Sequence, residues 1–440
     1  MSSTRYPISV RALWLVLALL LPAPVAAEDW KPARGVLSRD LPEWFTLGSE
    51  LRFRWEDRRG LRFDPNNNDG YLVSRFRINF AIEPSRHFGV YFQGQDSRGV
   101  KLDTGRRNNQ RDVFDIRQGY VRIGDEDGLW DLKAGRMRMV LGNERLLGNR
   151  DWSNTTPTHD VVKLALHKGK NRVDIFASSN VIIDDHAFDK HVDGNNYHGV
   201  YGSLGSIFPH TKIEPYFTQR TFTRVTGERG AAGDADIYTA GARAEATMPS
   251  GWDFEADYAR QFGSYGSDDV QAWVTTLVAG YTFQDATWKP HTYVEFNHAS
   301  GDQNFGDGVR GAYDTYFHDF HRHHGIADLL GRRNTRNVKS GVHFEPNSKT
   351  VVQLDHLLIW LASRNDAHYR HTGAVLVPRV PGGAASSYVG NEVDVQVVYT
   401  FSPEYSVGGG YARLFPGAFL AETTPASDSS LGYVFIEFTL

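Results

Sequence analysis

A chain of 440 residues that contains no cysteine cannot carry a disulfide framework or a cysteine-ligated zinc or iron–sulfur site. Its net charge of −4 provides no basic surplus for nucleic acid. Beyond the N-terminus no apolar run approaches the roughly 18 residues of a membrane helix, which excludes a helical membrane protein. Aromatic residues reach 13 % and glycines number 43, which favours an all-β chain. The lack of a long apolar run does not exclude a transmembrane β-barrel, because only every second residue of its strands is apolar.

Residues 1–27 have the three parts of a secretory signal peptide. Arg5 and Arg11 form a basic region, an apolar run from Ala12 to Leu21 follows, and small residues lead to Ala27. The sequence therefore predicts cleavage after Ala27 and export from the cytoplasm. Residues 28–43 are expected to form a short N-terminal segment, and residues 44–440 a single barrel domain.

Alternating apolar and polar residues, the period of a β-strand, dominate the chain after residue 43. Residues 44–56 are an example, with Phe53 and Trp55 on one face and Arg52 and Arg54 on the other. Eighteen such segments are expected: 44–56, 71–82, 88–97, 113–123, 130–141, 160–168, 171–181, 195–205, 212–222, 236–248, 251–263, 271–283, 290–300, 333–345, 349–361, 389–401, 405–415 and 431–440.

The lengths of these segments and of their links indicate a membrane barrel. Strands in soluble sheets usually have about five or six residues, whereas a tilted strand needs about nine to eleven to cross a bilayer. Links after even-numbered segments are short, such as 402–404, and most links after odd-numbered segments are long, such as 301–332. Outer-membrane barrels combine short periplasmic turns, long extracellular loops and an even strand number. The predicted fold is therefore an antiparallel transmembrane β-barrel of about 18 strands.

Several local motifs, taken in order, resemble the alginate-export family of outer-membrane proteins. They are Leu132–Arg138 (LKAGRMR), Gly142–Leu146 (GNERL), Asn149–Asn154 (NRDWSN), His323–Leu329 (HHGIADL), Asp355–His356 with Trp360, Val389–Asp394 (VGNEVD) and Tyr411–Leu420 (YARLFPGAFL). The resemblance implies an 18-stranded barrel whose arginine-lined pore passes an anionic polysaccharide to the cell exterior. It places pore arginines at Arg117, at Arg138 and at either Arg75 or Arg77. His324 stands where the family has an arginine.

The strand period independently places Arg52, Arg54, Arg75, Arg77 and Arg117 on the inner face. Trp130, Leu132 and Ala134 are expected to face outward, and so are Met137 and Met139. Both sets can face outward only if one extra residue at Gly135 shifts the alternation by one position. Such a β-bulge would turn Arg136 and Arg138 inward. The seven arginines are candidate pore-lining residues, because guanidinium groups bind carboxylates through paired hydrogen bonds. The alternative is that they pair with inward acids and only brace the wall.

Four histidines, His318, His321, His323 and His324, lie close together in the long link 301–332. Four histidines in seven residues are compatible with a zinc site. We interpret this link as a loop that folds over or into the mouth of the pore, and we expect neither a metal nor a cofactor there.

No nucleophile-elbow motif G-x-S-x-G is present, and we expect no enzyme. The sequence predicts a monomeric channel in the outer membrane of a Gram-negative bacterium, for an alginate-like anionic polysaccharide or a related organic anion. Its partners would be lipid, the solute and periplasmic export machinery, and not nucleic acid. The alternatives are a small-solute uptake porin, or an enzyme or adhesin built on the barrel.

Overall fold

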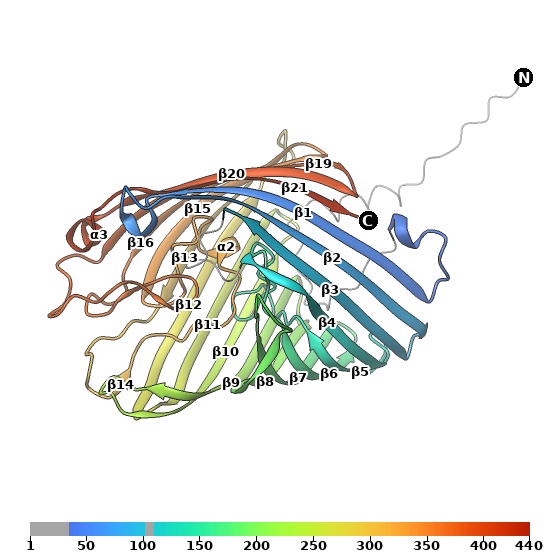
Figure 1. Ribbon diagram of the computed structural model, residues 1–440, viewed down its shortest axis with the longest axis horizontal. Helices are drawn as coiled ribbons and strands as arrows, with labels where there is room; N and C mark the ends of the chain where they lie inside the picture. The colour runs from blue at the N-terminus through green and yellow to red at the C-terminus, as the bar shows by residue number, and fades with distance from the viewer. Residues whose placement is uncertain (1–34, 102–109) are drawn as a thin grey trace, which may run out of the picture.

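The computed structural model describes residues 35–101 and 110–440, and the predicted signal peptide lies outside these residues. The chain forms a closed antiparallel barrel of 18 strands, as predicted (Figure 1). Each strand pairs with the barrel strands before and after it in the chain, and β1 pairs with β21 to close the sheet. Closure leaves no unpaired sheet edge, which a bilayer requires.

The barrel strands run along nearly the whole described chain. They are β1 (Phe45–Arg59), β2 (Asp69–Ser85), β3 (Phe88–Val100), β4 (Asp112–Gly124), β5 (Trp130–Met137), β6 (His159–Lys168), β7 (Asn171–Ile182), β8 (Lys190–Phe208), β9 (Thr211–Thr226), β10 (Ala232–Thr247), β11 (Trp252–Tyr265), β12 (Asp268–Thr282), β13 (His291–Ala299), β15 (Thr335–Asn347), β16 (Thr350–Trp360), β19 (Tyr388–Ser402), β20 (Tyr405–Pro416) and β21 (Ser429–Thr439).

The remaining elements lie outside the run of barrel strands. They are the 3₁₀ turns η1 (Val36–Ser38) and η2 (Leu61–Phe63), the short strands β14 (Val309–Arg310), β17 (His368–Tyr369) and β18 (Val375–Val377), and the helices α2 (Phe320–His323) and α3 (Ala418–Thr423). β14 is added parallel to β12, and β17 pairs with β18. No helix of the described residues has the length and apolar character needed to cross a membrane.

The two faces of each strand differ as the alternation predicts. In β1, Phe53 and Trp55 are 38 % and 40 % exposed on the outer face. Arg52 and Arg54, between them in the sequence, are buried on the inner face. Apolar side chains thus face the lipid and polar side chains face the interior, which is the pattern of a transmembrane barrel.

The links between strands confirm most of the predicted alternation of short and long. The turns at residues 86–87, 348–349 and 403–404 are short, whereas the links 300–334 and 361–387 are long. Several links are shorter than predicted, among them those at residues 227–231 and 266–267. The reason is that pairing between β9, β10, β11 and β12 continues well past the predicted strand ends.

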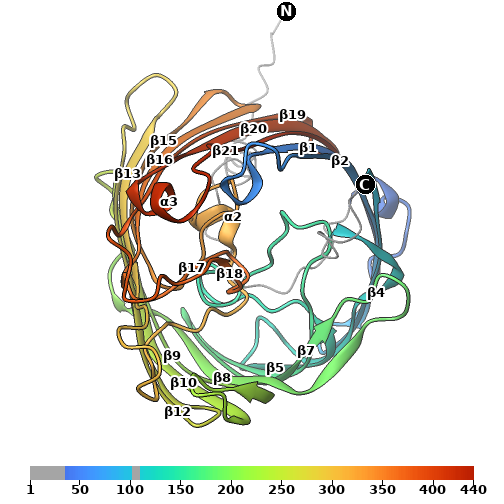
Figure 2. The same ribbon diagram turned by 60° about the vertical axis from the view of Figure 1, so that its left-hand side comes forward.

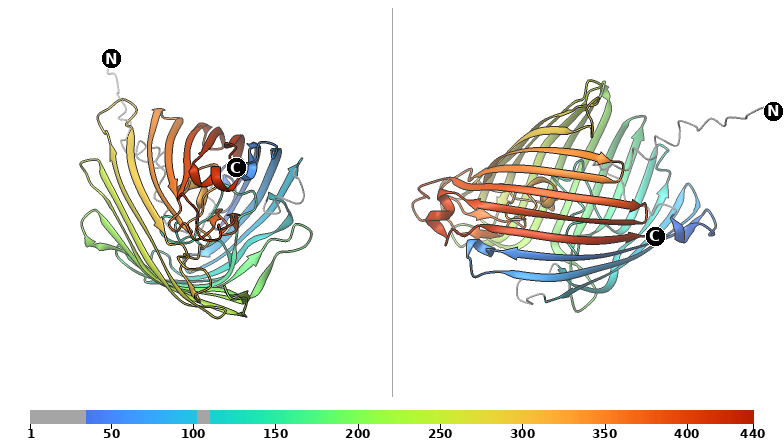
Figure 3. Two further views of the ribbon diagram at one scale, coloured as in Figure 1. Left: turned by 90° about the vertical axis from the view of Figure 1, so that its left-hand side faces the viewer. Right: turned by 90° about the horizontal axis from the view of Figure 1, so that it is seen from above.

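Three long links fold into the barrel and are named loop 138–158, loop 300–334 and loop 361–387 by their residues. Figure 2 shows α2 and the β17–β18 hairpin inside the outline of the barrel, and the left view of Figure 3 looks into the barrel from the same end. The backbone N–H groups of Gly148 and Asp319 donate to the carbonyl oxygens of Phe317 (2.8 Å) and Glu144 (2.9 Å), which joins the first two loops. Most side chains from Ala312 to Thr335 are buried, so loop 300–334 lies within the barrel.

Candidate functional site

Four arginines of β1 and β2 line one side of the interior. Arg52 lies directly opposite Arg75 in the ladder, and Arg77 lies opposite Glu50. Arg52, Arg54, Arg75 and Arg77 are 6 %, 1 %, 0 % and 5 % exposed. Like charges that face each other across a ladder repel, so this arrangement needs compensating groups.

Two carboxylates supply part of that compensation. Glu50 contacts Arg75 at 2.6 Å and Arg77 at 3.0 Å. Asp151, from loop 138–158, lies 2.9 Å from each of the same two arginines. Burial raises the pKa of the Asp151 carboxyl, but Arg75 and Arg77 outweigh it and hold that pKa well below its usual range. Asp151 is therefore ionised and fastens the loop to the wall.

Backbone carbonyls of the same loop complete the contact. Arg52 donates to the carbonyl of Asp151 (2.9 Å), and Arg54 donates to the carbonyl of Trp152 (2.5 Å). The guanidinium carbon of Arg54 also lies 3.8 Å from the ring centroid of Trp152, a cation–π contact. The bracing role considered for these arginines is thus present in the structure as contacts to loop 138–158.

Arg117 occupies a β-bulge in β4. The register with β3 passes from Gln118 to Ile116, so Arg117 is the extra residue, and it and Gln118 are both buried. Its guanidinium donates to Thr156 Oγ1 (2.6 Å), Gln93 Oε1 (2.5 Å) and Asn149 Oδ1 (3.2 Å). All three acceptors are neutral. We call Arg52, Arg54, Arg75, Arg77 and Arg117 the arginine wall.

The predicted bulge at Gly135 is wrong. β5 keeps an unbroken register with β4 and β6, and Met137 is fully buried inside the barrel instead of facing outward. Met139 is buried in the same internal cluster. The extra residue is on the neighbouring strand, at Arg117, and strand pairing rather than the sequence of β5 decides that position.

Arg136 and Arg138 consequently separate. Arg136 alternates with the buried Met137 and therefore lies on the outer side, where it pairs with Asp160 at 2.9 Å. Arg138 follows the end of β5, and it is close enough to Arg117 and Tyr91 to act on both electrostatically. The structure thus brings six of the seven predicted arginines to the interior and not Arg136.

The four histidines of loop 300–334 lie inside the barrel. His323 Nε2 is 2.7 Å from the carbonyl of Asn143, and His321 Nδ1 is 2.8 Å from Asp328 Oδ1. Burial lowers the pKa values of His318, His323 and His324 well below the usual range, so they are neutral at pH 7. Among the described residues, the group that brings three potential ligand atoms within 4.8 Å is Asp184, Asp185 and His186.

Sequence reasoning missed Arg58, which lies 2.9 Å from both Glu56 and Asp328. It shares the inward parity of Arg52 and Arg54, and extending the first predicted strand past Glu56 finds it. Arg145 pairs with Glu255 (2.8 Å) and Glu295 (2.9 Å) on the opposite side of the barrel. Arg332 pairs with Asp257 and donates to the carbonyl of Arg145 (2.8 Å). Loop residues such as Arg145 and Arg332 carry no periodicity that could have identified them.

Comparisons with known proteins agree with this architecture. The model of the alginate export family matches residues 43–434. No curated protein sequence matches the chain. Solved structures share the fold at low identity. OccD3 (OpdP) of Pseudomonas aeruginosa has a TM-score of 0.63 at 11 % identity, covering 96 % of this chain and 97 % of the other. OccK3 (OpdO) of the same species has 0.61 at 12 %, covering 91 % and 97 %. OccAB4 of Acinetobacter baumannii has 0.59 at 8 %, covering 90 % and 97 %.

A closed barrel with an apolar outer face and short turns at one end is the architecture of β-barrel proteins in the Gram-negative outer membrane. The family match covers far more than half of the sequence and includes every barrel strand except the last few residues of β21. The chain therefore belongs to the alginate export family of outer-membrane β-barrel proteins.

Proposed function

We propose that the protein is an anion-selective channel for an alginate-like polysaccharide or a related organic anion. The observation that carries the proposal is the charge balance of the arginine wall. Among the described residues, the ion pairs of its five arginines involve three carboxylates, Glu50, Glu56 and Asp151. The surplus is positive and faces the interior.

Local charge governs selectivity more than net charge does. The walls of a narrow pore exclude water, so each uncompensated charge acts over a longer range than in bulk solvent. Guanidinium groups bind carboxylates in paired, directional hydrogen bonds. A uronate chain carries one carboxylate per sugar, and the positive field of the arginine wall would attract these carboxylates into the lumen. Periplasmic export machinery would supply such a chain.

A second candidate is a porin for uptake of small solutes. Loops 138–158 and 300–334 pack against each other inside the barrel and are held to both walls, through Asp151 on one side and Arg145 on the other. A lumen narrowed in this way favours a small organic anion over a hydrated polymer. Both candidates require the arginine wall, and they differ in the size of solute that passes.

Reversal potentials in planar bilayers under a salt gradient test the proposal. The purified channel should be anion-selective, and the triple variant R75Q/R77Q/R117Q should shift the potential toward cations. R136Q is the matched control, because it removes one positive charge from the outer face. Soluble uronate oligomers should block the wild type more strongly than the triple variant. A cation-selective wild type that uronates do not block would overturn the proposal.

The length of the solute separates the two candidates. Uronate oligomers of increasing length are placed on one side of proteoliposomes, and their passage to the other side is measured. Passage of long oligomers supports polysaccharide transport, whereas passage of monomers alone supports the small-solute porin.

A further inference from the structure

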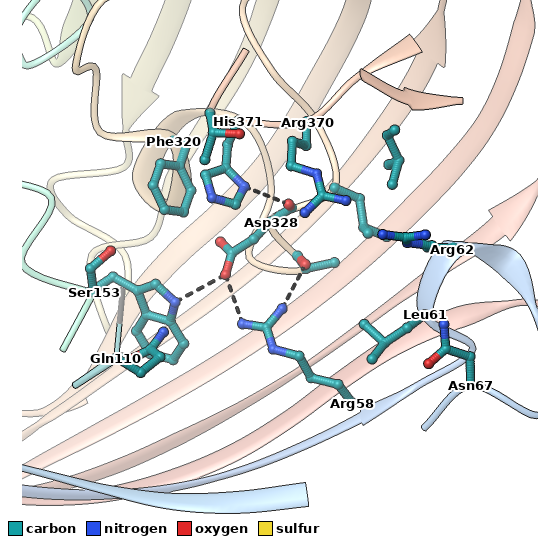
Figure 4. A pocket seen from close by; sticks show the side chains of 15 residues that line it. Arg58, Leu61, Arg62, Asn67, Gln110, Ser153, Phe320, Asp328, Arg370 and His371 are labelled. Carbon is teal, nitrogen blue, oxygen red and sulfur yellow. Dashed lines mark hydrogen bonds and ion pairs between the residues drawn. The ribbon is translucent and has the colours of Figure 1, made fainter. Parts of the chain in front are cut away.

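A cavity of about 560 Å³ opens at the end of the barrel that carries the long loops. It lies where η2, loop 138–158, loop 300–334 and loop 361–387 meet, and Figure 4 shows the side chains that line it. Because long loops are extracellular in outer-membrane barrels, it is a cavity of the outer mouth. Its volume falls within the range of about 300–1,000 Å³ typical of small-molecule sites.

The described side chains that line the cavity carry a positive surplus. Arg58, Arg62 and Arg370 approach it, and Asp328 is the one carboxylate among these described side chains. Arg58 is paired with Glu56 and Asp328, so the cationic character of the lining comes from Arg62 and Arg370. Asp328 accepts hydrogen bonds from Arg58 (2.9 Å) and from Trp152 Nε1 (3.1 Å), and it contacts His321 (2.8 Å). Its charge is therefore directed into the surrounding protein. Arg62 forms no ion pair with a described residue.

Apolar side chains form much of the remaining lining. Leu61, Leu329 and Leu376 come from three different segments. Phe320 joins them and stacks on His371 with ring centroids 3.8 Å apart. Burial lowers the pKa of His371 to about 4, so its ring is neutral at pH 7 and adds no charge to this surface. The cavity thus combines cationic and apolar groups.

The backbone that presents Arg62 is strained. Arg62 and Phe63 have φ values of 58° and 62°, in the left-handed region that few residues other than glycine adopt. Phe63 is fully buried in the cluster beneath and anchors the turn. Asp328 also has a positive φ, of 61°. Strained backbone of this kind persists where the surrounding structure holds it in place, as the buried Phe63 does here.

We propose that this cavity is a binding site for an organic anion with an apolar body, such as an aromatic carboxylate. The anionic group would lie against Arg62 and Arg370, and the apolar body against Leu61, Leu376 and Phe320. The inference rests on the proposed anion channel and narrows its solute to an amphipathic acid captured at the outer mouth. A fully hydroxylated uronate has no apolar surface to bury against this lining.

Isothermal titration calorimetry of the purified full-length barrel in detergent tests the site. The probes are 1-naphthoate, the cation 1-naphthylmethylamine, and galacturonate. We expect naphthoate to bind at least tenfold more tightly than galacturonate, and the amine not to bind. R62Q should weaken naphthoate binding about tenfold, and L376N should weaken it while leaving the weak binding of galacturonate unchanged. R86Q, at the opposite end of the barrel, is the matched control.

Galacturonate binding as tightly as naphthoate, or naphthoate binding that R62Q and L376N leave unchanged, would overturn the inference. The reversal potential separates this failure from failure of the proposed function. An anion-selective channel that does not bind naphthoate retains the proposed function and loses the mouth site. A cation-selective channel contradicts the proposed function, whatever it binds.

Discussion

Arg75 and Asp151 form an ion pair with Nη2 and Oδ2 2.9 Å apart, and it joins β2 to loop 138–158 across the interior of the barrel. Arg75 is fully buried, while the side chain of Asp151 is 41 % exposed. The wall arginine is thus enclosed, and the loop carboxylate faces the remaining open space. The pair positions the loop and also neutralises part of the arginine wall.

Removing the loop carboxylate should alter both stability and selectivity. D151N should lower the free energy of unfolding by about 2 kcal/mol, less than the 3–5 kcal/mol of a fully buried pair because Asp151 is partly exposed. It should also shift the reversal potential further toward anions, since Arg75 and Arg77 lose a counter-charge. Urea titration of heat-modifiable migration measures the first effect. D96N is the control, because Asp96 pairs with Arg98 on the surface and should cost less than about 1 kcal/mol. Unchanged selectivity in D151N would contradict the charge argument.

Shortening loop 300–334 should widen the pore. The backbone N–H groups of Tyr313 and Asn334 both donate to the carbonyl of Ser300, at 3.0 Å and 3.2 Å, so a three-residue Gly-Ser-Gly linker can replace residues 314–333. Single-channel conductance should rise several-fold, because buried side chains leave the lumen while the β13–β15 ladder is kept. Trimming the exposed residues 186–188 is the control and should leave conductance unchanged. A folded barrel of wild-type conductance would show that the loop does not limit flow.

Acidification should loosen loop 361–387. His368 is 2 % exposed, and burial lowers its pKa to about 4. If loop 361–387 opened and exposed the ring to water, the ring would titrate near 6.5. The open state therefore takes up a proton before the packed state does as the pH falls. The stabilisation of the packed loop by the neutral ring is fully present above pH 6.5 and is lost as the pH falls from about 6.5 to 4. By pH 5 the loss is on the order of 2 kcal/mol.

The absence of cysteine allows this loop to be labelled at one position. Thr372→Cys with an environment-sensitive dye should report a change between pH 7.5 and pH 5, and H368Q in the same background should reduce it. A response of equal size in both proteins would assign it to other groups, such as His371.

Gly135 should tolerate no side chain. Its φ is +135°, and an added Cβ would lie 2.3 Å from the carbonyl oxygen of Gly119 on β4. G135A should therefore cost at least about 1 kcal/mol and reduce the yield of folded barrel. G432A is the control, because its added Cβ would meet Tyr411 at an ordinary 3.7 Å. Equal refolding yields of the two variants would show that β5 can shift away from β4.

The period of two determined the barrel from the sequence alone. Each of the 18 predicted segments corresponds to a barrel strand, and the inner position of Arg52, Arg54, Arg75 and Arg77 follows from parity. This succeeds because lipid outside and polar groups inside impose opposite demands on successive residues. The same parity would have identified Arg58, had the first predicted strand been extended by two residues.

Only the tertiary structure decided where the alternation breaks and what the loops contact. The bulge is on β4 at Arg117 and not on β5 at Gly135, since a bulge depends on how two strands pair, and neither strand encodes that alone. Asp151 reaches Arg75 across 76 positions of sequence, and Arg145 reaches Glu295 across 150. Loop residues have no period that predicts such contacts. The sequence by itself therefore determined the barrel and its inward arginines, whereas closure of the barrel brought the loops onto them and fixed the shape of the mouth.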